Sequence, residues 1–152
     1  IMNVKNIFLY LVLLLFINTN LNSATPNNWT SYYSDNEVKI EYQYTDCQFL
    51  ESFNQEFVIF KITNLTNKQV NVSWNNESWY DKKCINCNDD KDGESFNEVS
   101  INPNQIVIGD CDTQNSLRIF SKFSDKLENM PGVNKIVKLT KFKLQNINIK
   151  YE

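Results

Sequence analysis

Between residues 38 and 45 the chain reads Val38-Lys39-Ile40-Glu41-Tyr42-Gln43-Tyr44-Thr45, so that apolar and polar side chains alternate without a break. Successive side chains of a β-strand point to opposite faces, and this alternation therefore predicts a half-buried strand. Residues 69–74 alternate in the same way. Residues 57–62 are apolar on both parities, as expected of a strand in the middle of a β-sandwich.

Turn-forming residues divide the chain into further short strands. The Asn-rich segment 64–68 joins strands 57–62 and 69–74, and the sequence predicts that these two form a hairpin. Residues 124–130 predict one helical turn, which Pro131-Gly132 ends. Strands are also predicted at 29–33, 96–101, 105–108 and 117–123, the second and third of these being separated by a turn at 102–104.

The C-terminal tail shows a shifting apolar parity. A strand face keeps one parity, so bulges or a turn are expected near Thr140 and near Gln145, which separate three strand pieces at 136–139, 142–144 and 147–151. The complete pattern is seven or eight short strands with almost no helix. It predicts an all-β fold, an antiparallel immunoglobulin-like β-sandwich, with a small antiparallel barrel as the alternative.

Residues 1–24 have the layout of a secretory signal peptide. Lys5 precedes an apolar run at 7–17, and a small-residue step at Ser23-Ala24 follows. The run is 11 residues long, whereas a helix needs about 20 to span a bilayer. The segment is therefore expected to be cleaved, leaving 25–152 as one exported domain that does not span a membrane. Periplasm, cell surface and free secretion remain open as its location.

The composition excludes several functions. The chain has no histidine, which removes Ser-His-Asp and Cys-His catalysis and most zinc hydrolase sites. With only three glycines it has no Gly-rich phosphate loop. The net charge of −3 and a single arginine, Arg118, argue against nucleic acid as a partner. An enzyme would have to work with paired carboxylates or a thiol pair.

The four cysteines, Cys47, Cys84, Cys87 and Cys111, predict two disulfides in an exported domain. Three pairings are possible, and we favour Cys47–Cys111 with Cys84–Cys87. Cys47 ends one predicted strand and Cys111 follows another, while Cys84 and Cys87 are close enough to pair locally. A redox-active dithiol at Cys84 and Cys87, or a four-cysteine zinc site, are the alternatives.

An acidic loop follows the second cysteine pair. Oxygen side chains at alternate positions, with Gly93 next, match the first half of a calcium loop, and the candidate ligands are Asn88, Asp90, Asp92 and Glu94. Position twelve is Val99, where such a loop needs a glutamate. A hydrophilic hairpin tip is the alternative interpretation, and calcium is the one ion that the sequence suggests; no other cofactor is expected.

Aromatic and basic residues supply the remaining candidate contacts. Trp74 continues an inward parity and is predicted to lie in the core. Trp79 and Tyr80 would either form a stacking platform for a sugar or a peptide, or cover the end of the core. From Val133 onward the chain has five lysines and one glutamate. This tail is either a basic edge strand, which resists edge-to-edge pairing, or a docking face for an acidic polymer or a membrane surface.

The arrangement also resembles a group of small exported proteins, without a known activity, from AT-rich bacterial genomes. The resemblance rests on a strand that ends in Cys and on the segments Ser73-Trp74, Trp79-Tyr80, Cys84-x-x-Cys87, Gly109-Asp110-Cys111 and 117–123. It implies an exported sandwich with paired cysteines. The sequence thus predicts an exported, non-enzymatic protein with a binding or envelope-structural role and a protein or glycan partner. The alternatives are a calcium-dependent adhesion module that uses loop 88–94, and a secreted enzyme.

Overall fold

The computed structural model describes residues 28–87, 93–112 and 116–152, so the predicted signal segment, residues 1–24, lies outside it. The described residues form nine β-strands and one short 3-10 helix. The strands are β1 (Thr30–Ser34), β2 (Val38–Cys47), β3 (Gln55–Asn64), β4 (Val70–Tyr80), β5 (Lys83–Cys84), β6 (Phe96–Ile101), β7 (Ile106–Ile108), β8 (Arg118–Phe123) and β9 (Leu139–Tyr151). The helix η1 (Leu127–Asn129) lies inside the predicted helical turn. The all-β prediction is confirmed.

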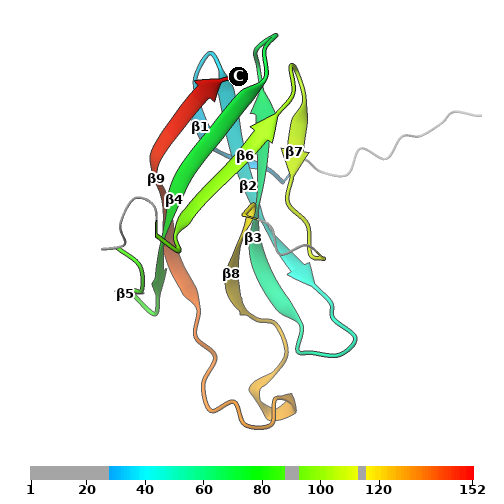
Figure 1. Ribbon diagram of the computed structural model, residues 1–152. Coiled ribbons are helices and arrows are strands. Elements are labelled where there is room, and N and C mark those ends of the chain that lie inside the picture. The colour runs from blue at the N-terminus through cyan, green and yellow to red at the C-terminus, as the bar shows by residue number, and fades with distance from the viewer. Residues whose placement is uncertain (1–27, 88–92, 113–115) are drawn as a thin grey trace, which may run out of the picture.

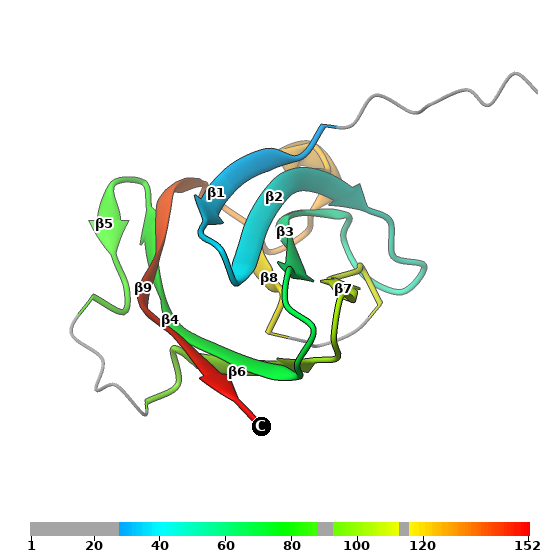
Figure 2. The same cartoon turned by 90° about the horizontal axis from the view of Figure 1, so that it is seen from above.

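The strands make two antiparallel sheets (Figure 1). Sheet A has the order β1-β2-β3-β7, with β8 also paired to β3. Sheet B has the order β5-β4-β6, with β9 paired to β4. Seen from above, the two sheets curl around a shared interior (Figure 2). This is the layered arrangement of a β-sandwich, as the strand pattern predicted.

The central strand β3 is buried on both faces. On its inner face Phe60 and Ile62 join the main core, where Trp74 of β4 is 1% exposed, as predicted from its parity. On its outer face Phe57 and Ile59 form a second apolar cluster, packed against four half-buried side chains, Trp29, Phe49, Cys111 and Phe120. The absence of alternation in β3 therefore reflects two covered faces.

The predicted hairpin between strands 57–62 and 69–74 is wrong. Strand β3 belongs to sheet A and β4 to sheet B, so the segment 65–69 crosses between the sheets. Asn64 fastens this crossover, because its amide nitrogen donates to the carbonyls of Lys68, Ile101 and Asn102 at 2.8, 3.1 and 3.0 Å. An alternating pattern identifies the buried face of a strand but not its neighbour, and here the buried faces of β3 and β4 meet across the core.

The C-terminal tail forms one bulged strand, β9, rather than three pieces. It pairs with β4 along its length, and the register shifts between Ser73 and Asn75 and between Trp79 and Tyr80. Each shift places one additional residue on β9. At the second shift this residue is Thr140, and at the first Asn146 and Ile147 together face Trp74, with Asn146 at a φ of 54°. The predicted bulges near Thr140 and Gln145 are therefore confirmed, and they let both halves of β9 turn apolar side chains inward.

Candidate functional site

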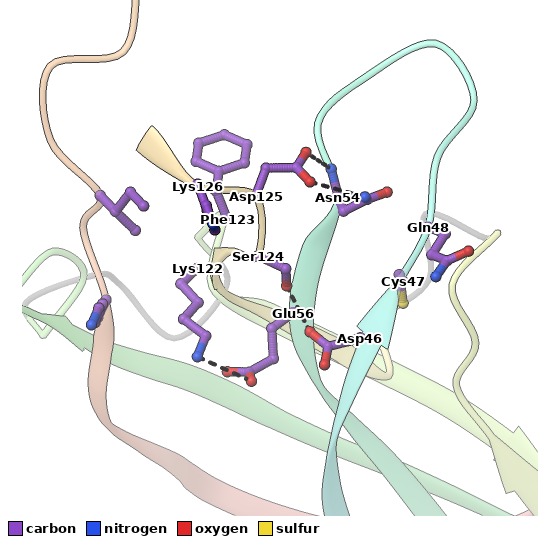
Figure 3. A pocket seen from close by; sticks show the side chains of 12 residues that line it. Asp46, Cys47, Gln48, Asn54, Glu56, Lys122, Phe123, Ser124, Asp125 and Lys126 are labelled. Carbon is purple, nitrogen blue, oxygen red and sulfur yellow. Dashed lines mark hydrogen bonds and ion pairs between the residues drawn. The ribbon is translucent and has the colours of Figure 1, made fainter. Parts of the chain in front are cut away.

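A cleft of about 510 Å³ opens at the end of the sandwich where β2 and β8 end and β3 begins (Figure 3). The segment that leads into β9 forms part of its wall. Its lining carries carboxylates, lysines, amides and two apolar side chains: Asp46, Cys47, Gln48, Asn54, Glu56, Lys122, Phe123, Ser124, Asp125, Lys126, Ile136 and Lys138. Residues far apart in sequence therefore meet at one end of the fold.

A row of charged residues crosses the floor of the cleft. Asp46 of β2 lies opposite Glu56 of β3, and Glu56 lies opposite Lys122 of β8. The Lys122 ammonium lies 3.4 Å from Oε2 of Glu56, and the Ser121 hydroxyl donates to Oε1 at 2.7 Å. Since the side chains of directly opposed residues lie on one face of a sheet, the two carboxylates face the cleft side by side.

Neighbouring segments hold Asp46 and Asp125, the remaining two carboxylates of the cleft. The Ser124 hydroxyl donates to Asp46 at 2.6 Å. The backbone and side-chain nitrogens of Asn54 donate to the two oxygens of Asp125 at 2.8 and 3.0 Å (Figure 3). The Asn54 side-chain oxygen accepts from the backbone N–H of Phe49 at 3.1 Å. These bonds fasten the loop after β2 to the loop after β8, and so fix the shape of the cleft.

The lining of the cleft balances its charges, because three carboxylates face three ammonium groups among its residues. Such a surface offers hydrogen-bond donors and acceptors at short range, which suits a polar ligand rather than an apolar one. Among the described residues no group of three or more Cys, Asp or Glu side chains is placed to hold a metal ion.

The two predicted contact residues, Trp79 and Tyr80, lie on opposite faces of sheet B. The Tyr80 hydroxyl donates to the carbonyl oxygen of Phe120 at 2.6 Å, and the two rings stack with centroids 6.3 Å apart. Tyr80 therefore joins sheet B to strand β8 of sheet A and belongs to the end of the core. Trp79 points outward, with the ammonium of Lys141 4.4 Å from its ring centroid. The structure does not bring the two side chains together as one platform.

Tyr80 gives a prediction in alkaline solution. Burial raises the pKa of its phenol to about 12, whereas an unfolded tyrosine titrates near about 10. Between these values the unfolded chain releases its proton first, so the stability that the phenol contributes is present below about pH 10 and is lost as the pH rises toward 12. We expect Tyr80→Phe to lower the free energy of unfolding by about 1 kcal/mol near neutral pH and by less at about pH 11.

Urea unfolding of the wild type and Tyr80→Phe near pH 8 and pH 11 measures this change. Tyr42→Phe, the same substitution at another tyrosine packed against the core, is the matched control for the loss of a phenolic hydroxyl. If Tyr80→Phe lowers the free energy of unfolding by the same amount near pH 8 and near pH 11, the Tyr80 phenol is not responsible for the loss of stability at alkaline pH.

Both predicted disulfides are present. Cys47 and Cys111 are bonded with their Cα atoms 5.5 Å apart, which ties the end of β2 to the segment after β7. Cys84 and Cys87 close a local loop after β5, with a Cα separation of 5.9 Å. None of the four cysteines is free. Both cysteine pairs therefore act as covalent ties in this structure.

The hairpin that carries Cys84 is fixed to the tail of the chain. Asp81 and Lys82 have φ values of 47° and 71°, as a two-residue hairpin turn between right-twisted strands requires. The Lys135 ammonium bonds the Asp81 carboxylate, and this hydrogen bond is the main cause that lowers the pKa of Asp81. The backbone N–H of Lys82 donates to the hydroxyl of Thr140 at 3.1 Å. The turn is thus held from outside as well as by its own strands.

The proposed calcium ligands fall mostly outside the described residues. Asn88, Asp90 and Asp92 lie there, and Glu94 is exposed. Calcium binding by loop 88–94 stays a prediction.

Comparison with known proteins gave no relative: no family model, no curated protein and no solved structure matches the chain. Within the residues that the structure describes, no helix has the length and apolar character needed to cross a bilayer.

Proposed function

We propose that this chain is an exported, non-enzymatic binding module with an immunoglobulin-like sandwich, and that the cleft at the strand ends is its ligand site. The two antiparallel sheets and the two disulfides support the sandwich part of this proposal. Paired cysteines are typical of chains that fold in an oxidising compartment, which supports export together with the signal-like residues 1–24.

The observation that carries the proposal is that each carboxylate of the cleft is held in place by a hydrogen bond or an ion pair. Glu56 is held by Lys122 and Ser121, Asp46 by Ser124, and Asp125 by two donors of Asn54. Groups that are preorganised by fixed neighbours recognise a polar ligand at a low cost in conformational entropy. A glycan or the polar backbone of a peptide offers the matching donors and acceptors.

A second candidate function is hydrolysis by two carboxylates. Asp46 and Glu56 are opposed on adjacent strands in a cleft, and glycoside hydrolysis uses carboxyl pairs separated by about 5 to 10 Å. A general acid in such a pair works best in apolar surroundings. Glu56 instead has the Lys122 ammonium at 3.4 Å, which favours the binding assignment.

The test is an NMR titration of the mature protein with soluble oligosaccharides and short peptides, accompanied by turnover assays on nitrophenyl glycosides and esters. We expect at least one compound of the panel to shift the amide resonances around Asp46, Glu56 and Lys122. Asp46→Asn should weaken that binding by about tenfold, which corresponds to loss of one charged contact of about 1.4 kcal/mol. Glu98→Gln, at an exposed residue of β6 outside the cleft, should leave binding unchanged.

The outcomes separate the two candidates. Turnover that disappears in both Asp46→Asn and Glu56→Gln would replace binding by hydrolysis as the function. Resonance shifts that lie elsewhere, or a panel that shifts none of the cleft resonances, would remove the cleft as the ligand site.

A further inference from the structure

A second surface with ligand-binding chemistry lies on the outer face of sheet B. Trp79 of β4 is directly opposite Lys141 of β9, whose ammonium lies 4.4 Å from the indole centroid. The ammonium of Lys143, two residues further along the same strand, lies 5.9 Å from that ring. Both distances are within the range of cation–π attraction. We refer to Trp79, Lys141 and Lys143 as the indole platform.

The indole platform is held from both edges of its strand. On one side Trp79 is opposite Cys84, which is bonded to Cys87. On the other side the Thr140 hydroxyl donates to the carbonyl oxygen of Trp79 at 3.1 Å. The side chain of Asn86 adds further bonds, because it accepts from the N–H of Ser78 at 2.8 Å and donates to the carbonyl of Asn76 at 2.7 Å. The backbone that carries the ring is therefore fixed in the absence of a ligand.

The charges of the platform are available to a ligand. Neither Lys141 nor Lys143 forms an ion pair with any of the residues that the structure describes. The carboxylate opposite Lys143 is Glu77, and it accepts a hydrogen bond from the side chain of Gln145 at 3.1 Å. Two ammonium groups thus stand beside an indole ring on a strand whose exposed side chains carry a net positive charge, although the chain as a whole has a net charge of −3.

We propose that the indole platform binds an acidic polysaccharide, a polymer of uronic acid sugars. An indole ring offers a flat apolar face to the C–H groups of a sugar ring. Two residues of one strand are about 7 Å apart, so long lysine side chains on that strand can reach carboxylates on neighbouring sugars. Loss of the lysine contacts with the ring on binding is offset by new charge-assisted hydrogen bonds to carboxylates.

Other polyanions fit the platform less well. Nucleic acid binding rests on many phosphate contacts, and this chain has a net negative charge with a single arginine. That arginine, Arg118, lies over the ring of Phe57, which belongs to the outer apolar cluster of sheet A. An anionic membrane is held by basic residues together with apolar side chains that insert, whereas the platform offers one half-buried indole.

The experiment uses the mature protein with polygalacturonate as the acidic polymer and dextran as the neutral one. Affinity electrophoresis and quenching of tryptophan fluorescence report binding. We expect retention by polygalacturonate and none by dextran, with binding that weakens as salt is raised. Trp79→Ala and the double variant Lys141→Gln, Lys143→Gln should each weaken binding by about tenfold or more.

Matched controls keep the result specific. Lys150→Gln removes a lysine from the far end of β9, opposite Asn71, and should change binding less than about twofold. The circular dichroism spectrum and melting temperature of each variant show whether it has folded. Trp29→Phe removes an indole that packs on the outer apolar cluster of sheet A, and it should leave the quenching by polygalacturonate in place.

Four outcomes would overturn the proposal. These are no retention by polygalacturonate, equal retention by dextran, a loss in Lys150→Gln as large as in the double variant, and equally tight binding to duplex DNA or to phosphatidylserine vesicles. The last would show a general attraction to polyanions rather than recognition of a sugar polymer. None of these results depends on the cleft at the strand ends, since Asp46→Asn should not change the binding of polygalacturonate.

Discussion

Replacing Cys47 and Cys111 together by alanine is expected to lower the free energy of unfolding by about 4 kcal/mol. The disulfide closes a loop with a sequence separation of 64 residues, and the chain-entropy relation gives about 4 kcal/mol for a loop of this length. Cys47 is also 1% exposed within the outer apolar cluster of sheet A, so the substitution leaves a small void there. Guanidinium unfolding of the purified variant measures the change.

The second disulfide is the matched control for this prediction. Cys84 and Cys87 have a sequence separation of only 3, and the same relation gives roughly 1.5 kcal/mol for so short a loop. Replacing both by alanine should therefore cost less than half as much as replacing Cys47 and Cys111. Equal losses from the two double variants would show that loop length does not govern the contribution of these bonds.

Asn64→Asp is expected to destabilise the protein by about 3 to 5 kcal/mol, which is the cost of an unpaired buried charge. Asn64 is 1% exposed, and its nitrogen donates to three carbonyl oxygens. The substitution places a carboxylate oxygen against those carbonyls, while the other oxygen continues to accept from the N–H and hydroxyl of Thr66, both at 2.9 Å. Both the crossover after β3 and the turn after β6 lose their common anchor.

The same substitution at an exposed position separates the cost of burying a charge from the effect of the added charge itself. Asn102→Asp should change the free energy of unfolding by less than about 0.5 kcal/mol, because Asn102 is exposed. Urea unfolding of both variants at neutral pH gives the comparison. A loss of under about 1 kcal/mol in Asn64→Asp would mean that water or a rearranged turn satisfies the three carbonyls.

The strands were predictable because alternation is a local property of the sequence. The stretch 38–45 lies within β2, residues 96–101 coincide with β6, and the shifting parity of the tail located both bulges of β9. Pairing was not predictable in the same way. The hairpin prediction failed because the neighbour of a strand depends on where the crossover leads, and the anchor of that crossover, Asn64, binds carbonyls of residues 101 and 102, far along the chain.

Glu41 shows a second reason why local patterns are incomplete. It occupies a polar position of the alternation, yet it is 6% exposed, because the outer face of sheet A is covered there. Lys39 and Lys61 lie 2.9 and 2.7 Å from its carboxylate, and Lys61 also lies over the ring of Trp29. Burial is the largest single influence and raises the pKa of Glu41, but the hydrogen bonds and the positive charges of the two lysines together lower it by more, so that its pKa lies below its usual value.

The cleft could not be predicted from the sequence, because its position depends on which strands pair. Its charged floor is made by Asp46, Glu56 and Lys122, which become neighbours only through the pairing of three strand ends. Trp79 and Tyr80 were predicted as a pair because they are adjacent in the chain. Adjacent residues of one strand point to opposite faces, and that rule, applied to these two positions, is sufficient to separate their side chains.

The buried amide of Asn64 also bears on N-linked glycosylation. Asn64-Leu65-Thr66 has the Asn-x-Thr form of an acceptor site, and the nitrogen that would carry the sugar is the one that donates to three carbonyls inside the fold. A glycan at this position cannot coexist with the two sheets as they are packed. In a host that glycosylates secreted chains, a glycan on Asn64 would therefore have to break these three hydrogen bonds, and the modified chain could not adopt this packing of the two sheets.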